Sequence, residues 1–162
     1  MKYLGFILLF LLADLFFAWL NINSWHWLQP FLMAIIFLYY ITDNPWIYYS
    51  FAGVAGLWVD AYSATFGLHT ISFLLVLFIL SSLQLTIFTS KNTGAIILLT
   101  AIGVFSFWLI VWLLHFILPW SVYTFYGGQW LKILRFYFID VVTICVVYIL
   151  YFNLKLKRHQ SR

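Results

Sequence analysis

Charged side chains are scarce in this sequence of 162 residues: they make up 7% of it, whereas soluble domains carry about 25%. Glutamate is absent, and the only acids are four aspartates, Asp14, Asp43, Asp60 and Asp140. The single cysteine, Cys145, excludes a framework of intrachain disulfides. Hydrophobic residues, in contrast, account for 66% of the chain. This composition excludes a soluble globular domain and predicts an integral membrane protein.

Apolar segments follow one another along the chain and leave only short linkers. We expect six membrane helices, at about 3–20, 27–42, 45–60, 68–88, 94–118 and 130–154. At about 20 residues for each helix, six spans use about 120 residues. The sequence therefore predicts an all-α integral membrane protein with one transmembrane domain over 1–162, which ends in a basic tail at 155–162. Asp14 lies inside the first segment and no cleavage site follows, so we expect a retained helix there.

The second and third segments are short for membrane helices. A helix over 27–42 or 45–60 rises only about 24 Å, against about 30 Å of hydrocarbon. Such a helix can be buried by longer neighbours, cross with little tilt, or thin the bilayer locally.

The distribution of basic residues predicts the topology. With both termini in the cytoplasm, the residues on the inner side are Lys2, Lys91, Lys155, Lys157, Arg158 and Arg162. Only Lys132 and Arg135 then lie outside, which agrees with the positive-inside rule and favours an even number of spans. The net charge of +4 comes largely from the tail, so it indicates anionic lipid and not nucleic acid.

The end of the third segment is the most informative part of the chain. Gly53, Gly56 and Asp60 come before a turn of small residues, and Gly67 and His69 open the next segment. An aspartate at the centre of a membrane helix costs about 3 kcal/mol on translocon scales, and less near the interface. Its carboxylate therefore usually faces the interior of a bundle and pairs with another group. The two glycines either allow helix packing within the chain, which we favour, or form a partner contact together with Asp60.

The residues that could carry chemistry form no catalytic pattern. The sequence has no HExxH, no nucleophile elbow and no phosphate-binding glycine loop. The spacings of His69, His115 and the aspartates match no set of metal ligands. We therefore expect no enzymatic activity, no metal and no cofactor. An ion- or proton-coupled carrier that uses Asp14, Asp60 and Asp140 stays open.

From Pro30 to about Leu75 the sequence resembles the MreD family of rod shape-determining membrane proteins. The family pattern has a proline at the start of the second helix and an aromatic residue near its end. A glycine pair, an aspartate, a small-residue turn and a Gly-Leu-His-like entry to the next helix follow. The matching positions here are Pro30, Tyr39, Tyr40, Gly53, Gly56, Asp60, Ser63, Ala64, Thr65, Gly67, Leu68 and His69. The glycine spacing before Asp60 is one residue tighter than the common family form, and the turn after it is one residue shorter.

The resemblance implies a non-catalytic scaffold of the bacterial cell-wall elongation (rod) complex, which contributes to peptidoglycan synthesis and cell shape. Members of the family lie in the bacterial plasma membrane, bind MreC directly, and work with MreB, RodA and a class B penicillin-binding protein. Their fold is similar to the six-helix substrate-binding subunit of energy-coupling-factor transporters, which implies a central groove for a partner helix, a lipid or a small molecule. The groove-lining residues implied here are Pro30, Gly53, Gly56, Asp60, Gly67 and His69. On this hypothesis Asp60→Leu or Gly56→Leu weakens the recovery of MreC without unfolding the protein.

The same fold similarity raises an alternative, the substrate-binding subunit of a vitamin transporter. Those subunits commonly dock through small residues at four-residue spacing on the first helix. Here Ala13 and Ala18 are five residues apart among bulky neighbours, which argues against this alternative.

Overall fold

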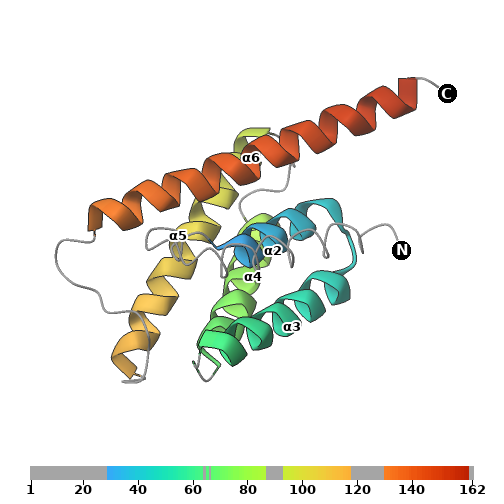
Figure 1. Ribbon diagram of the computed structural model, residues 1–162. Coiled ribbons are helices and arrows are strands. Elements are labelled where there is room, and N and C mark those ends of the chain that lie inside the picture. The colour runs from blue at the N-terminus through green and yellow to red at the C-terminus, as the bar shows by residue number, and fades with distance from the viewer. Residues whose placement is uncertain (1–28, 64, 66, 87–92, 118–129, 161–162) are drawn as a thin grey trace.

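The computed structural model describes residues 29–63, 65, 67–86, 93–117 and 130–160. Apart from short turns, this part of the chain is helical (Figure 1). Its helices are α2 (Pro30–Ile41), α3 (Pro45–Ser63), α4 (Leu68–Thr86), α5 (Thr93–Ile117) and α6 (Trp130–Gln160). The expected first helix at 3–20, which contains Asp14, lies outside the described residues.

Three of these helices, α4, α5 and α6, are long and apolar enough to cross a membrane. Large apolar side chains on them point outward, among them Phe78, Phe105 and Phe138. Soluble monomers rarely expose contiguous apolar surface on this scale. The prediction of an all-α protein with membrane character is thus confirmed for the described residues. Six spans and cytoplasmic termini stay predictions.

Helix α2 forms the centre of the bundle. Every residue from Pro30 to Tyr40 is buried, and α2 packs against α3, α4, α5 and α6 (Figure 1). A helix of 12 residues is only about 18 Å long, which is shorter than the about 30 Å of hydrocarbon. The second apolar segment is thus buried by longer neighbours, one of the three outcomes that the sequence allowed.

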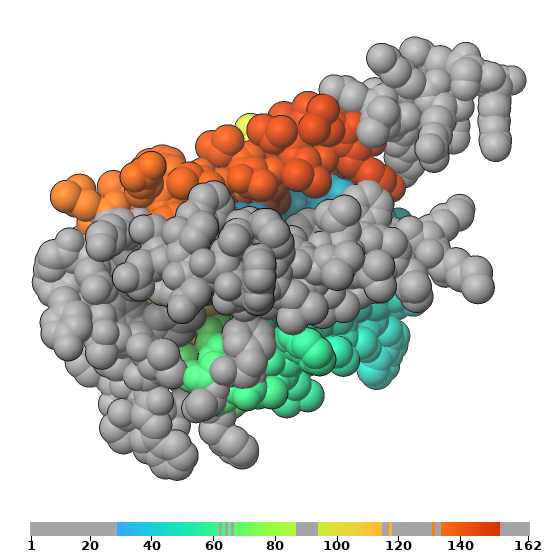
Figure 2. All heavy atoms as spheres, in the orientation of Figure 1, coloured from blue at the N-terminus to red at the C-terminus, as the bar shows by residue number. Residues whose placement is uncertain are grey.

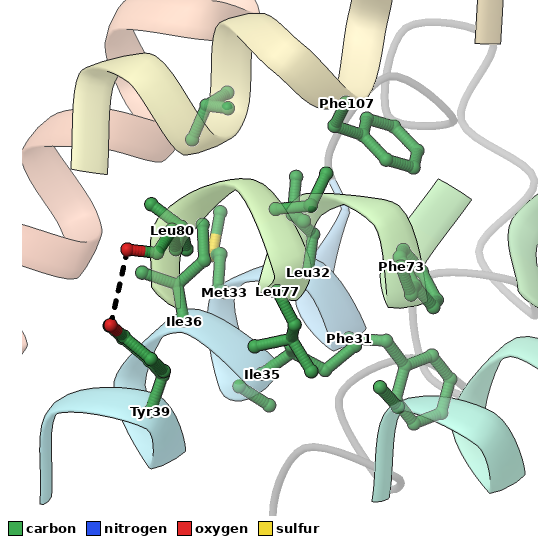
Figure 3. Packing of buried hydrophobic residues seen from close by; sticks show 14 of the residues in the cluster. Phe31, Leu32, Met33, Ile35, Ile36, Tyr39, Phe73, Leu77, Leu80 and Phe107 are labelled. Carbon is green, nitrogen blue, oxygen red and sulfur yellow. Dashed lines mark hydrogen bonds between the residues drawn. The ribbon is translucent and has the colours of Figure 1, made fainter. Parts of the chain in front are cut away.

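The core is built around α2, and α3, α4 and α5 contribute most of its other buried side chains. Figure 3 shows Phe31 and Ile35 of α2 beside Phe73 and Leu77 of α4, with Phe107 of α5 completing the contact. All five side chains are at most 1% exposed, so the cluster is close-packed.

Proline and asparagine define the starts of α2 and α3. Pro30 occupies the first turn of α2, where the missing N–H is least costly. Pro45 begins α3 in the same way, and the backbone N–H of Trp46 donates to the Asn44 side chain at 3.1 Å. Asn44 is therefore the N-cap of α3, as expected of this residue type.

Tyrosine hydroxyls connect α2 to its neighbours at the end of the helix. Tyr39 donates to the backbone oxygen of Leu80 at 3.2 Å (Figure 3). Its hydroxyl also contacts the side chain of Gln84. Tyr40 lies 3.1 Å from the hydroxyl of Thr100. These bonds satisfy polar groups that burial would otherwise leave unpaired, so the tyrosines join α2 to α4 and α5.

Helix α6 lies along one side of the bundle, over α5 and α2, with α3 and α4 on the opposite side (Figures 1 and 2). It continues to Gln160, beyond the end expected at residue 154, so the helix runs into the basic tail. Likewise, α3 continues to Ser63, beyond the end expected at residue 60.

Candidate functional site

The carboxylate of Asp60 accepts five hydrogen bonds from the segment that starts α4. Its Oδ1 accepts from the Thr65 hydroxyl at 2.8 Å, and from the backbone N–H and ring Nδ1 of His69 at 2.9 and 3.0 Å. Its Oδ2 accepts from the backbone N–H and the hydroxyl of Thr70 at 3.0 and 2.7 Å. Asp60 is only 7% exposed. An ionised carboxylate offers about four lone-pair sites, and five donors surround it here, so no acceptor capacity is left over.

This arrangement caps the N-terminus of α4 from another helix. The first N–H groups of a helix have no partner within it, and a Ser, Thr, Asp or Asn side chain at the N-cap usually accepts from them. Here the residue before α4 is Gly67, which has no side chain and a φ of +75°. Asp60 supplies the missing acceptor to the N–H groups of His69 and Thr70, and its negative charge faces the positive end of the helix dipole.

Gly56 allows the two helices to come close enough for this cap. A Cβ atom at Gly56 would lie 2.4 Å from the Cα and 2.8 Å from the N of Thr70. Gly56 and Asp60 are four residues apart and therefore lie on the same face of α3. The same face of α3 therefore contacts Thr70 at two points. Gly56 lies against its backbone, and Asp60 accepts its hydrogen bonds.

Gly53 has a different environment. A Cβ atom built there would meet nothing within 4 Å among the described residues. The close helix contact therefore belongs to Gly56 with Asp60, and the pair formed by Gly53 and Gly56 does not act as one packing face.

The structure brings together four of the six residues that the sequence singled out: Gly56, Asp60, Gly67 and His69. Pro30 begins α2, and no described contact joins it to this cluster. Sequence reasoning missed Thr65 and Thr70, the hydroxyl donors. The signal for them was a helix start at Leu68 preceded by glycine, because a helix without a capping side chain needs an acceptor from elsewhere.

The cluster is suited to holding two helices together and not to acid–base chemistry. Both oxygens of Asp60 are engaged within the chain, and His69 is 1% exposed with Nδ1 on that carboxylate. Among the described residues, no three His, Cys, Asp or Glu side chains are close enough to bind a metal ion.

No family model, no curated protein and no solved structure matches this chain. The resemblance to the MreD family therefore rests on the sequence alone.

Proposed function

We propose that this protein is a non-catalytic membrane scaffold that binds a membrane-spanning helix of a partner through the outward side of α3. On the resemblance to the MreD family, the partner is MreC, and the setting is the rod complex of the bacterial plasma membrane. A six-span bundle with both termini in the cytoplasm belongs to the same proposal.

The state of Asp60 supports a scaffold over a carrier. A carboxylate that binds a transported ion or proton must exchange its partners during the cycle. Asp60 instead holds five donors from its own chain, two of them backbone N–H groups that start a helix. Releasing them would uncap α4, so this carboxylate is better explained as a structural group.

The observation that carries the proposal is the outward stripe of α3, which consists of Trp46, Ser50, Gly53 and Leu57. These residues are spaced by seven, three or four positions and so share one face. Trp46 is 79% exposed and Leu57 is 63% exposed, while Gly53 has open space in front of it among the described residues. Small residues between bulky apolar ones let a second membrane helix approach closely, which fits a single-span partner such as MreC.

The test is co-purification of the tagged protein with MreC from the same genome, in detergent. We expect Gly53→Leu to reduce the recovery of MreC at least about tenfold, because the added side chain separates the helices. Gly94→Leu is the matched control, since it makes the same substitution at an exposed position near the start of α5. Equal recovery of MreC with both variants would show that the outward stripe of α3 is not the binding surface. If the unmodified protein recovers no MreC, then MreC is not the partner.

Asp60→Leu and Gly56→Leu are unsuitable for this test. The first removes the cap of α4, and the second forces a side chain into the backbone of Thr70. Both variants would lower the recovery of a partner through damage to the α3–α4 pair, whether or not these residues touch the partner.

A further inference from the structure

Asp140 is a second buried acid, and its environment is opposite to that of Asp60. It is 0% exposed, and among the described residues neither of its carboxyl oxygens has a hydrogen-bond partner. It lies within the candidate membrane span Leu134–Phe152 of α6. Phe136 and Ile144, four residues before and after it, are also buried, so Asp140 is in the middle of the face by which α6 packs on the bundle.

An ionised carboxylate cannot remain in such a place without a partner. The free energy of burying an unpaired charge is large, and a group in this position stays neutral by holding a proton. A protonated carboxyl can be buried at far smaller cost, so the packing of α6 described here requires the proton.

The helices that pack against α6 offer no described counter-charge. On α2 the ionisable side chains are Tyr39 and Tyr40, whose hydroxyls bond to α4 and α5. On α5 the only ionisable residue is His115, whose side chain lies outside the described part.

On α6 itself, Arg135 is exposed, and Tyr137 donates to the backbone oxygen of Ala101 at 3.1 Å. Cys145, Tyr148 and Tyr151 are the other ionisable residues of this helix with described side chains. Arg135 is therefore the one cation of α6 with a described side chain in or near the span, and it faces outward; the side chain of Lys132 lies outside the described part.

We propose that Asp140 is a proton-binding site that controls whether α6 packs against α2 and α5. With the proton bound, α6 packs on α2 and α5 as described here. When the proton leaves, the charged carboxylate draws water or a cation, and α6 separates from its neighbours around Asp140. This inference goes beyond the scaffold function and does not depend on the identity of its partner.

Cys145 provides a built-in reporter of this movement. It is the only cysteine in the chain and lies five residues after Asp140 on the same helix. Its side chain is partly buried beside Thr100 of α5. Separation of α6 from α5 would therefore expose this thiol to a membrane-permeant maleimide.

The experiment compares the unmodified protein with Asp140→Asn, which keeps the size of the side chain but cannot ionise. The rate of maleimide labelling at Cys145 is measured from about pH 5 to about pH 10, and the ratio of the two rates is taken at each pH. The ionisation of the thiol itself is common to both proteins and cancels in the ratio. We expect the labelling rate of the unmodified protein, divided by that of Asp140→Asn, to be near one at low pH and to rise at least about tenfold at high pH. A ratio that does not change with pH would overturn the proposal.

A second measurement uses only the unmodified protein, so it holds even if Asp140→Asn fails to fold. Dicyclohexylcarbodiimide attacks protonated carboxyls in apolar surroundings: the acid proton moves to a carbodiimide nitrogen while the carboxyl oxygen bonds to the central carbon. The adduct then rearranges to a stable N-acylurea that mass spectrometry locates in the sequence. We expect labelling of Asp140 that declines as the pH rises, and no labelling of Asp60, whose five donors hold the ionised form. Absence of the adduct at Asp140, or labelling independent of pH, would contradict the proposal.

Discussion

Replacement of Asp60 measures directly how much the cap from α3 contributes to the bundle. Asp60→Ala leaves five donors without their acceptor, in a place that is only 7% exposed and therefore poorly reached by water. Loss of an N-cap costs about 1 kcal/mol, and each buried donor left unsatisfied costs about 1–3 kcal/mol. The hydroxyls of Thr65 and Thr70 can rotate toward other acceptors, but the two backbone N–H groups cannot. We therefore expect a loss of about 3–5 kcal/mol in the free energy of unfolding.

Asp60→Asn separates the charge from the hydrogen bonds. Its amide oxygen can still accept from the donors now on Oδ1, whereas its NH₂ group would face the N–H of Thr70. We expect this variant to lose about 2 kcal/mol, between the unmodified protein and Asp60→Ala. Asp43→Asn is the matched control, because it makes the same chemical change at an exposed turn and should alter the free energy by less than about 0.5 kcal/mol.

The assay is unfolding by dodecyl sulfate in mixed micelles, followed by far-ultraviolet circular dichroism and extrapolated linearly to zero denaturant. Domains are stable by only about 5–15 kcal/mol, so the expected losses are large enough to measure. A loss below about 1 kcal/mol for Asp60→Ala would refute the capping argument, because one backbone donor alone accounts for that much.

The close approach of the helices and the tyrosine bonds make two further predictions. Gly56→Ala should destabilise the protein by about 3 kcal/mol because its Cβ would meet the backbone of Thr70, whereas Gly53→Ala, in open space, should be neutral or stabilise by up to about 1 kcal/mol. Similar losses from both glycine variants in the same unfolding assay would contradict the assigned contact. Tyr40→Phe removes the bonds to Thr100 and to the backbone of α5 and should cost about 1 kcal/mol, with an unchanged unfolding midpoint as the contrary result.

The residues at which α2 and α3 begin could be predicted from the sequence, because a helix start depends on adjacent residues. Pro30 and Pro45 begin α2 and α3, and Asn44 caps α3, as residues of these types do in most proteins. The ends of α3 and α6 were predicted too early, because Ser63 and the basic tail carry no strong stop signal.

The importance of Asp60 could also be predicted, but not its role. A lone carboxylate at the end of an apolar segment is costly enough to require a partner. Which partner it takes depends on where the start of α4 lies relative to α3, and no periodicity within either segment contains that information. The same limit applies to Gly53 and Gly56, which are alike in sequence and differ only in what lies opposite them.

The sequence by itself predicted the membrane character of this protein and the approximate positions of its described helices. Scarce charge and long apolar segments suit a membrane, and proline, asparagine and glycine set the turns, since these effects act through composition and near neighbours. Only the tertiary structure decided that α2 is buried on all sides, that Asp60 caps α4, and that Asp140 is enclosed without a described partner. The physical reason is that a buried polar group is satisfied by whatever the packing of distant segments places within about 3 Å of it.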